Sequence, residues 1–164
     1  MALVSVYLGL GSTVGNRLGN MESALRLLDG ALGRPYSALS TVIETEAWGF
    51  DGGKFLNACV LYRIPRKGTP EGHGAELLRI CKGIERELGR EEGTLFDKEG
   101  KRVYRDRPID IDILFYGKER IDTPDLQVPH PLIAVRPFVL DPLREIAKPS
   151  LRAAFPDLFP KKRG

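Results

Sequence analysis

The segment "RDRPIDIDIL" carries the residues whose types and spacing are best suited to chemistry. If this segment is a strand, its isoleucines face one side and Asp110 and Asp112 face the other, because side chains alternate along a strand. Two neighbouring carboxylates repel each other unless a cation sits between them. Magnesium is the natural cation, since it binds one or two carboxylates together with water and substrate phosphates. The segment therefore predicts a magnesium–phosphate site or, alternatively, a half-exposed strand whose aspartates pair with Arg105 and Arg107.

Several basic residues precede the two aspartates along the chain. A guanidinium group matches phosphate oxygens in a bidentate geometry, and a carboxylate pair can hold the metal that accompanies a polyphosphate. The combination therefore favours a metal-bound polyphosphate over free nucleic acid as the ligand. The basic residues are Arg90, Lys101, Arg102, Arg105 and Arg107.

A glycine-rich stretch, "GLGSTVGNR" from Gly9 to Arg17, reads as a turn between an apolar run and a helical pattern. Many proteins bind phosphate at such a turn. The glycines here are spaced G-x-G-x-x-x-G, which does not match the dinucleotide-binding pattern, and the lysine of a P-loop is missing. The phosphates are therefore expected near the aspartates and not at this turn.

The chain has 164 residues, a net charge of +3 and 42% hydrophobic residues, which is typical of one globular domain. The modest charge does not indicate a nucleic-acid partner. No apolar run reaches the roughly 18 residues of a membrane span, and the N-terminus lacks a secretion signal, so we expect a cytoplasmic protein. Cys59 and Cys81 lie at apolar positions without metal-ligand spacing, and both are expected to be reduced core residues.

The elements that must position these residues follow from the hydrophobic pattern. Apolar runs predict strands over residues 3–8, 40–46, 55–64 and 108–117, the middle two forming a hairpin. Helical spacing predicts helices over residues 18–30, 70–88 and 138–146, with Gly89 ending the second. The order strand, helix, strand, strand, helix, strand is that of an α+β, ferredoxin-like split βαβ fold. Such a fold packs its helices on one face of an antiparallel sheet and leaves the other face for a site.

The sequence also resembles a known family, the 6-hydroxymethyl-7,8-dihydropterin pyrophosphokinases of folate biosynthesis. Five blocks carry the resemblance, in the family's order: "LGLGSTVGNR", "IETEAWGFDGGKFLNACV", "IERELGR", "RPIDIDILFYG" and "VPHPLIAVRPFVLDPLREIA". The resemblance implies a single pyrophosphokinase domain over residues 1–164, with about 148–164 as a C-terminal extension. The family's ferredoxin-like α+β fold agrees with the element order given above.

The resemblance implies a reaction in which the β,γ-pyrophosphoryl group of ATP moves to the hydroxymethyl oxygen of the pterin, with release of AMP. Asp110 and Asp112 match the family's two magnesium-binding aspartates, so two Mg²⁺ ions bound with ATP are expected. Arg90 and Arg107 match positions near the phosphates and complete the expected catalytic set. The ions would neutralise the triphosphate and stabilise charge at the attacked β-phosphorus.

The resemblance further assigns residues to the two substrates. Asn57 would hydrogen-bond the pterin, and Phe55 and Phe138 would stack on its two faces. The other pterin-side positions are Gly11, with Ser12 beside it in the family's first loop, and Thr45, Glu46 and Trp48. The nucleotide-side positions are Glu85, Arg90, Arg107, His130 and Arg136. His73 matches no family position and is expected at the surface.

Two rival functions stand beside this one. A ferredoxin-like module that binds RNA or a regulatory ligand would use the open sheet face, but it would bring phosphates against Asp110 and Asp112. A kinase that moves only the γ-phosphate would need a P-loop or protein-kinase motifs, which the sequence lacks. The expected partners are therefore ATP and the pterin, with neither nucleic acid nor a membrane, and the expected state is a monomer.

Overall fold

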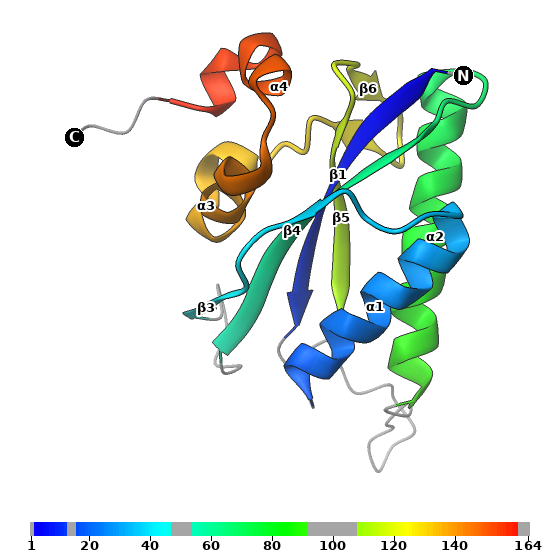
Figure 1. Ribbon diagram of the computed structural model, residues 1–164, viewed down its shortest axis with the longest axis vertical. Coiled ribbons are helices and arrows are strands. Elements are labelled where there is room, and N and C mark those ends of the chain that lie inside the picture. Colours follow the sequence, from blue (N-terminus) through cyan, green and yellow to red (C-terminus); the bar gives the residue numbers. More distant parts are fainter. Residues whose placement is uncertain (1, 13–15, 47–53, 92–107, 161–164) are drawn as a thin grey trace.

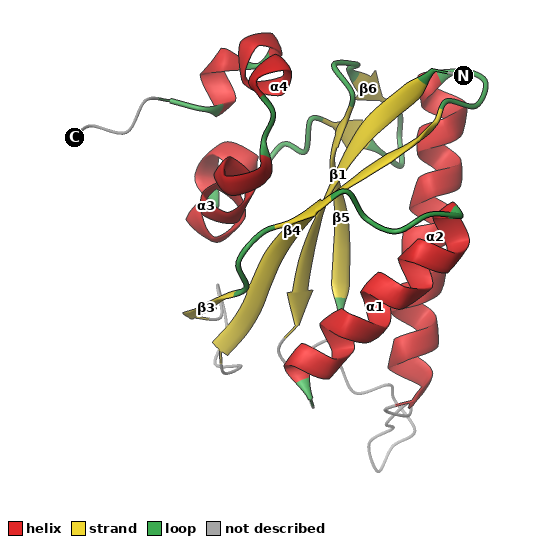
Figure 2. Ribbon diagram, viewed as in Figure 1, coloured by secondary structure: helices red, strands yellow, loops and turns green. Residues whose placement is uncertain are grey.

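An antiparallel sheet forms the centre of the computed structural model, which describes residues 2–12, 16–46, 54–91 and 108–160. The strand order is β2-β4-β1-β5, and β3 also pairs with β4 (Figure 1). Two long helices lie on one face of the sheet and the C-terminal helices lie on the other (Figure 2). The strands are β1 (Leu3–Ser12), β2 (Ala38–Leu39), β3 (Ile43–Glu46), β4 (Lys54–Pro65), β5 (Asp110–Tyr116), β6 (Ile121–Asp122) and β7 (Gln127–Val128). The helices are α1 (Arg17–Leu32), α2 (Pro70–Glu91), α3 (Pro137–Ile146) and α4 (Pro149–Ala154), with 3-10 turns at Ile133–Val135 and Pro156–Leu158.

The core between the sheet and the two long helices follows from alternation along the central strand β1. Val4, Val6, Leu8 and Leu10 all point to this side and are almost completely buried. Burying an aliphatic side chain contributes about 1.5–3 kcal/mol, so this core is a main source of stability. The opposing stripes on α1 and α2 are Met21, Ala24 and Leu28, and Leu77, Cys81, Ile84 and Leu88. The sheet and these helices thus form the base on which the site is built.

The opposite face of the sheet is divided between a second core and an uncovered area. Tyr7 and Phe115 are buried there under Leu143, Leu151 and Phe155 of the C-terminal segment. The rings of Phe115 and Phe155 pack with their centroids 5.3 Å apart. The expectation that this whole face would stay open is therefore wrong, because α3 and α4 supply enough apolar surface to bury part of it.

The predicted elements are found with three local differences. The strand expected over residues 40–46 begins only at Ile43, as β3, and the short strand β2 precedes the expected range. Ser40 lies between the two, and its hydroxyl accepts a hydrogen bond from the Cys59 N–H at 2.8 Å. Helix α2 continues through Gly89 to Glu91, because a glycine weakens a helix without necessarily ending it. The pair β6–β7 was not predicted. Both cysteines are buried and unbridged, as expected.

None of the described helices combines the length and the apolar character that crossing a membrane would require.

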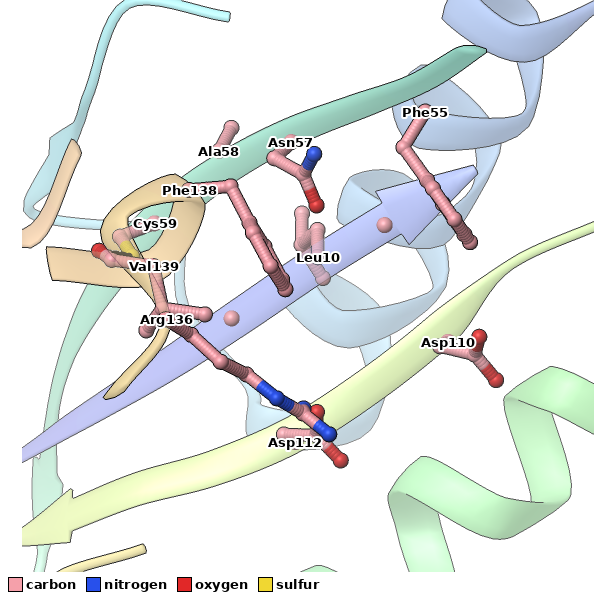
Figure 3. A pocket seen from close by; sticks show the side chains of 12 residues that line it. Leu10, Phe55, Asn57, Ala58, Cys59, Asp110, Asp112, Arg136, Phe138 and Val139 are labelled. Carbon is pink, nitrogen blue, oxygen red and sulfur yellow. Dashed lines mark hydrogen bonds between the residues drawn. The ribbon is translucent and has the colours of Figure 1, made fainter. Parts of the chain in front are cut away.

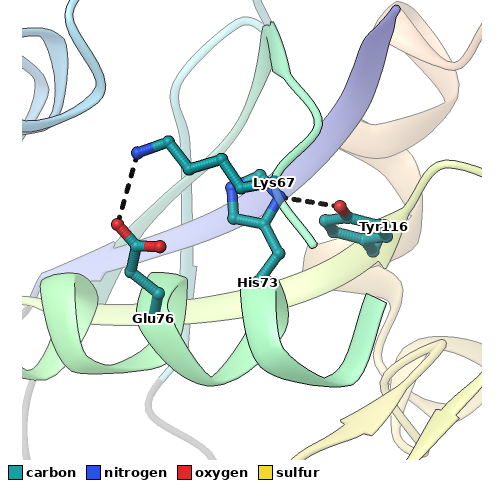
Figure 4. A network of polar contacts seen from close by, with 4 residues as sticks. All are labelled: Lys67, His73, Glu76 and Tyr116. Atoms are coloured by element: carbon teal, nitrogen blue, oxygen red, sulfur yellow. Dashed lines mark hydrogen bonds and ion pairs between the residues drawn. The ribbon is translucent and has the colours of Figure 1, made fainter. Parts of the chain in front are cut away.

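His73 lies in the core and not at the surface, which corrects the expectation from sequence. It is 4% exposed, and its Nδ1 lies 2.7 Å from the Tyr116 hydroxyl (Figure 4). Burial lowers the pKa of His73, and this effect outweighs the opposing charge of Glu76; the cations Lys67 and Arg66 lower the pKa further. The fold therefore accommodates the neutral imidazole.

We predict that His73 makes the protein less stable in acid. The pKa of the folded state lies below that of the unfolded chain, so the unfolded chain binds a proton first as the pH falls below about 6.5. The free energy of unfolding should therefore decrease between about pH 7.5 and pH 5.5, and it should decrease less in His73→Gln. Denaturant titrations of both proteins at the two pH values measure this difference. An equal decrease in both would contradict the prediction.

Candidate active site

The part of the sheet that the C-terminal helices leave uncovered contains a pocket of about 230 Å³. Its floor is formed where β1 runs between β4 and β5, and Phe138 and Val139 of α3 stand at one side of it (Figure 3). The pocket therefore draws on all three long strands and on the start of a C-terminal helix.

The register of the sheet determines which side chains meet in this pocket. Gly11 of β1 lies opposite Asn57 of β4 on one side and opposite Asp110 of β5 on the other. The next row across the same strands consists of Cys59, Gly9 and Asp112. An amide and two carboxylates thus project from the same face of the sheet, separated by residues without side chains.

The two glycines of β1 give the pocket its depth. A methyl group on Gly11 would lie 3.3 Å from Oδ1 of Asn57, which is tighter than ordinary van der Waals contact. A methyl group on Gly9 would lie 3.5 Å from the side chain of Leu114 and would occupy the floor. Residues 9–12 were expected to belong to a turn, but they continue β1 because they pair with both neighbouring strands. The glycines therefore serve as a flat strand surface.

Ser12 does not face the pocket, which corrects the position implied by the family resemblance. Its side chain is 1% exposed and its hydroxyl donates a hydrogen bond to the carbonyl of Pro108. Asn20 of α1 donates to the same carbonyl through Nδ2 at 3.2 Å. The direction of Ser12 follows from alternation, since it shares the helix-side face with Leu10.

Aromatic and amide groups line one half of the pocket. Phe55 of β4 and Phe138 of α3 stand on either side of the cavity (Figure 3). Asn57 is 7% exposed, and its Nδ2 donates to Oγ1 of Thr45 at 2.7 Å. This bond orients the amide, so its oxygen is placed toward Gly11. A flat, polar heterocycle would find ring faces and an amide edge here.

Charged groups line the other half. Asp110 and Asp112 are half-buried on β5, and Arg136 extends its guanidinium toward this strand (Figure 3). Nδ1 of His130 accepts a hydrogen bond from the Leu132 N–H at 3.2 Å, so the proton of the neutral ring is assigned to Nε2. Burial lowers the pKa of His130. The nearby charge of Asp112 acts against this shift, and the charge of Arg136 adds to it. His130 is therefore a neutral hydrogen-bond donor at physiological pH.

Glu85 of α2 lies behind β5, on the helix side of the sheet. The residue is 9% exposed, and its Oε2 accepts a hydrogen bond from the Ile111 N–H at 2.8 Å. Its Oε1 lies 3.2 Å from Nζ of Lys82. The carboxylate thus binds the backbone between the two aspartates of the pocket.

The structure brings most of the described candidate residues together. Those that line the pocket itself are Gly11, Phe55, Asn57, Asp110, Asp112, Arg136 and Phe138. Thr45 joins them through Asn57, and His130 is close enough to Asp112 and Arg136 for both charges to act on it. Trp48 and Arg107 lie outside the described residues, and for Glu46 and Arg90 only the backbone is described, in β3 and α2.

Five further pocket residues were not identified from the sequence. They are Gly9, Leu10, Ala58, Cys59 and Val139. Gly9 could have been found, because it lies two residues before Gly11 just as Asp110 lies two residues before Asp112. The other four occupy ordinary apolar positions and gave no such signal.

Fold and site together define a class: an α+β protein with a small-molecule pocket that has a carboxylate pair at one end and an aromatic, amide-lined surface at the other. The family model for 7,8-dihydro-6-hydroxymethylpterin-pyrophosphokinase matches residues 7–148. The chain belongs to this family, and its reaction is therefore pyrophosphoryl transfer in folate biosynthesis.

Proteins of several organisms are similar to the chain over most of the chain's length. The 2-amino-4-hydroxy-6-hydroxymethyldihydropteridine pyrophosphokinase of Porphyromonas gingivalis is 42% identical over 144 residues, which is 87% of this chain and 90% of that protein. The protein of the same name from Aquifex aeolicus is 39% identical over 145 residues, 88% of this chain and 81% of that protein. A folate synthesis bifunctional protein of Arabidopsis thaliana is 42% identical over 142 residues, 86% of this chain and 26% of that protein.

We predict that Gly11→Ala weakens binding of the pterin substrate without unfolding the protein. The added methyl group would press on Oδ1 of Asn57 and displace the amide. The dissociation constant for the pterin, measured by fluorescence or calorimetry, should rise by about tenfold, or 1.4 kcal/mol. Gly30→Ala is the matched control, because a methyl group on this helical glycine meets no atom within 4 Å. Unchanged pterin binding in Gly11→Ala would contradict the prediction.

Proposed function

We propose that the pocket holds 6-hydroxymethyl-7,8-dihydropterin with its hydroxymethyl group directed toward Asp110 and Asp112. The observation that carries this proposal is the cross-strand row in which Gly11 separates Asn57 from Asp110. A flat ring lying over Gly11 would reach the amide at one edge and the carboxylates near the other. The acceptor oxygen and the metal-binding end of the pocket would then be adjacent.

In this proposal Asn57 forms hydrogen bonds with the edge of the pterin, and Phe55 and Phe138 stack on the two faces of the ring. Thr45 supports the arrangement, because its bond to Nδ2 fixes the orientation of the amide. Face stacking contributes about 0.5–1.5 kcal/mol per aromatic pair beyond the area that it buries. A buried amide that loses its partner costs about 1–3 kcal/mol, which makes Asn57 a determinant of selectivity.

Asp110 and Asp112 would hold two magnesium ions together with the phosphates of ATP. The residues present fit this role, because the two carboxylates project from one face and offer the hard oxygen ligands that magnesium requires. When bound, the ions would neutralise the triphosphate and stabilise charge on the departing AMP. The chain's own contribution is to hold the hydroxymethyl oxygen in line with the β-phosphorus, so that a new P–O bond forms as the bond to the α,β-bridging oxygen breaks.

The remaining nucleotide contacts are assigned to basic and polar groups at the same end of the pocket. Arg136 and His130 would bind phosphate oxygens, the first as a cation and the second through Nε2–H. Arg90 and Arg107 retain the nucleotide-side roles that the family resemblance implies, whereas Glu85 is buried behind β5 and is assigned no phosphate contact. This distribution separates the pterin end from the phosphate end along the three long strands.

We further infer that the fold is ferredoxin-like, which the strand order β2-β4-β1-β5 supports. Residues 1–164 would act as one monomeric pyrophosphokinase domain, with about 148–164 as an extension. Burial of Leu151, Phe155 and Phe159 against the sheet supports the inclusion of that extension in the domain. The two unbridged cysteines are consistent with the reducing cytoplasm.

We predict that the purified protein forms AMP from ATP only when magnesium and the pterin are both present. Asp112→Asn should reduce the rate by more than about 100-fold, or 2.7 kcal/mol, because it removes charge from the proposed ligand pair. Asp125→Asn is the matched control, since Asp125 is exposed and does not line the pocket. Chromatography of the nucleotide products measures both rates. Release of ADP, or a rate within about tenfold of the wild type in Asp112→Asn, would overturn the proposal.

We predict that Asn57→Ala chiefly weakens pterin binding. Loss of the oriented amide should raise KM for the pterin by about ten- to 100-fold, as expected for a lost hydrogen bond in a buried site. The KM for ATP should stay within about twofold, because Asn57 lies at the other end of the pocket. Steady-state kinetics with each substrate varied in turn test the difference. Equal increases in the KM for the pterin and the KM for ATP would show that this half of the pocket is not specific for the pterin.

A further inference from the structure

The strand that carries the two aspartates lies at an edge of the sheet. Within the described residues β5 pairs with β1 on one side and with no long strand on the other. An edge strand exposes backbone N–H and C=O groups that no ladder satisfies. The two neighbouring carboxylates also repel each other in the absence of a cation. The segment that must be placed most accurately is therefore one that the sheet alone holds weakly.

Side chains from the two long helices and from β1 hold the backbone on both sides of Asp110. Before it, the carbonyl of Pro108 accepts hydrogen bonds from Ser12 and from Asn20. After it, the Ile111 N–H donates to Oε2 of Glu85 at 2.8 Å. Both contacts are on the helix side or the outer edge of β5, away from the pocket that the aspartates line.

We propose that Glu85 is a positioning residue, whose bond to the Ile111 N–H fixes the direction in which Asp110 and Asp112 project into the pocket. This inference rests on the proposed function, because it presumes that the acidic pair binds the metal that accompanies ATP. Glu85 acts through the peptide group that links the two ligands. The role is distinct from the nucleotide contact that the resemblance implies for Glu85.

A carboxylate suits this task better than a neutral group. A hydrogen bond from a backbone N–H to an ionised oxygen is about twice as strong as a neutral one. The second oxygen of Glu85 lies 3.2 Å from Nζ of Lys82, which offsets the cost of burying the charge. The side chain is 9% exposed, so water competes little for the bond.

The test compares Glu85→Leu, which removes the acceptor, with Glu85→Gln, which keeps an oxygen at the same position. Glu87→Leu is the control, because it removes the same charge from an exposed position of the same helix. Binding of Mn²⁺ is measured by electron paramagnetic resonance with ATP present and the pterin absent, so no turnover occurs. Hydrogen exchange of the Ile111 amide is measured by NMR on the proteins without substrates. Thermal melts establish that each variant is folded.

Glu85→Leu should weaken Mn²⁺ binding in the ATP complex by at least about tenfold, the usual effect of losing a group that orients metal ligands. It should also speed exchange of the Ile111 amide by at least about tenfold. Glu85→Gln should stay within about threefold of the wild type in both measurements, and the affinity of Glu85→Leu for the pterin should not change.

Four results would overturn the inference. If Glu85→Leu binds Mn²⁺ as tightly as the wild type, or if its Ile111 amide exchanges at the wild-type rate, Glu85 does not position the pair. If Glu85→Leu and Glu85→Gln lose affinity for ATP to the same extent when EDTA has removed the metal, Glu85 contacts the nucleotide directly. If the wild type itself binds no Mn²⁺ in the presence of ATP, the proposed role of the acidic pair fails as well. This result therefore distinguishes a failure of the proposed function from a failure of the inference about Glu85 alone.

Discussion

The site depends on one constraint, the antiparallel register that sets β4, β1 and β5 side by side with two glycines in the middle strand. This register brings Asn57 and Asp110 to either side of Gly11, although they are distant in sequence. A side chain at the central position would fill the space between the amide and the carboxylate. Within the described residues, the floor of the pocket is thus set by strand pairing.

The same face of the sheet carries a buried core in one half and the candidate pocket in the other. The register between β1 and β5 shifts between Tyr7 and Leu8, where β5 carries an extra residue, Leu114. Phe115 therefore pairs with Tyr7 on the side of the C-terminal helices. Phe155 and Phe159, which lie beyond the residues that the family model matches, close this core. The guanidinium carbon of Arg120 lies 5.1 Å from the ring centroid of Phe155, and that of Arg152 lies 5.4 Å from the ring centroid of Phe159. The covered half anchors α3, and α3 in turn brings Phe138 to the pocket.

The sequence predicts the parts of this arrangement that depend on local periodicity. Alternation in "PIDIDIL" places Asp110 and Asp112 on one face, and helical spacing locates α1 and α2 within a few residues. Prediction from the sequence fails where a tertiary contact decides whether a residue is buried or how two strands are paired. Ser12 and His73 fall on the buried faces of β1 and α2, two residues after Leu10 and four before Leu77, but a polar side chain alone does not predict burial there. The Pro108 carbonyl and the Tyr116 hydroxyl, which come from distant segments, give each a partner in the core. The bulge in β5 is likewise invisible, because an extra residue such as Leu114 changes the register without changing the apolar pattern.

An edge position for β5 has a functional reason that a central position would not provide. A further strand on its outer side would satisfy the Ile111 N–H, but it would also occupy space beside the aspartates, where we propose that phosphates bind. Satisfying that N–H with the carboxylate of Glu85 from α2 leaves this space open while still holding the backbone. A side-chain acceptor satisfies a single backbone N–H, whereas a neighbouring strand would place its own backbone along this edge. The helix that buries one face of the sheet thereby also completes the edge on which the acidic pair depends.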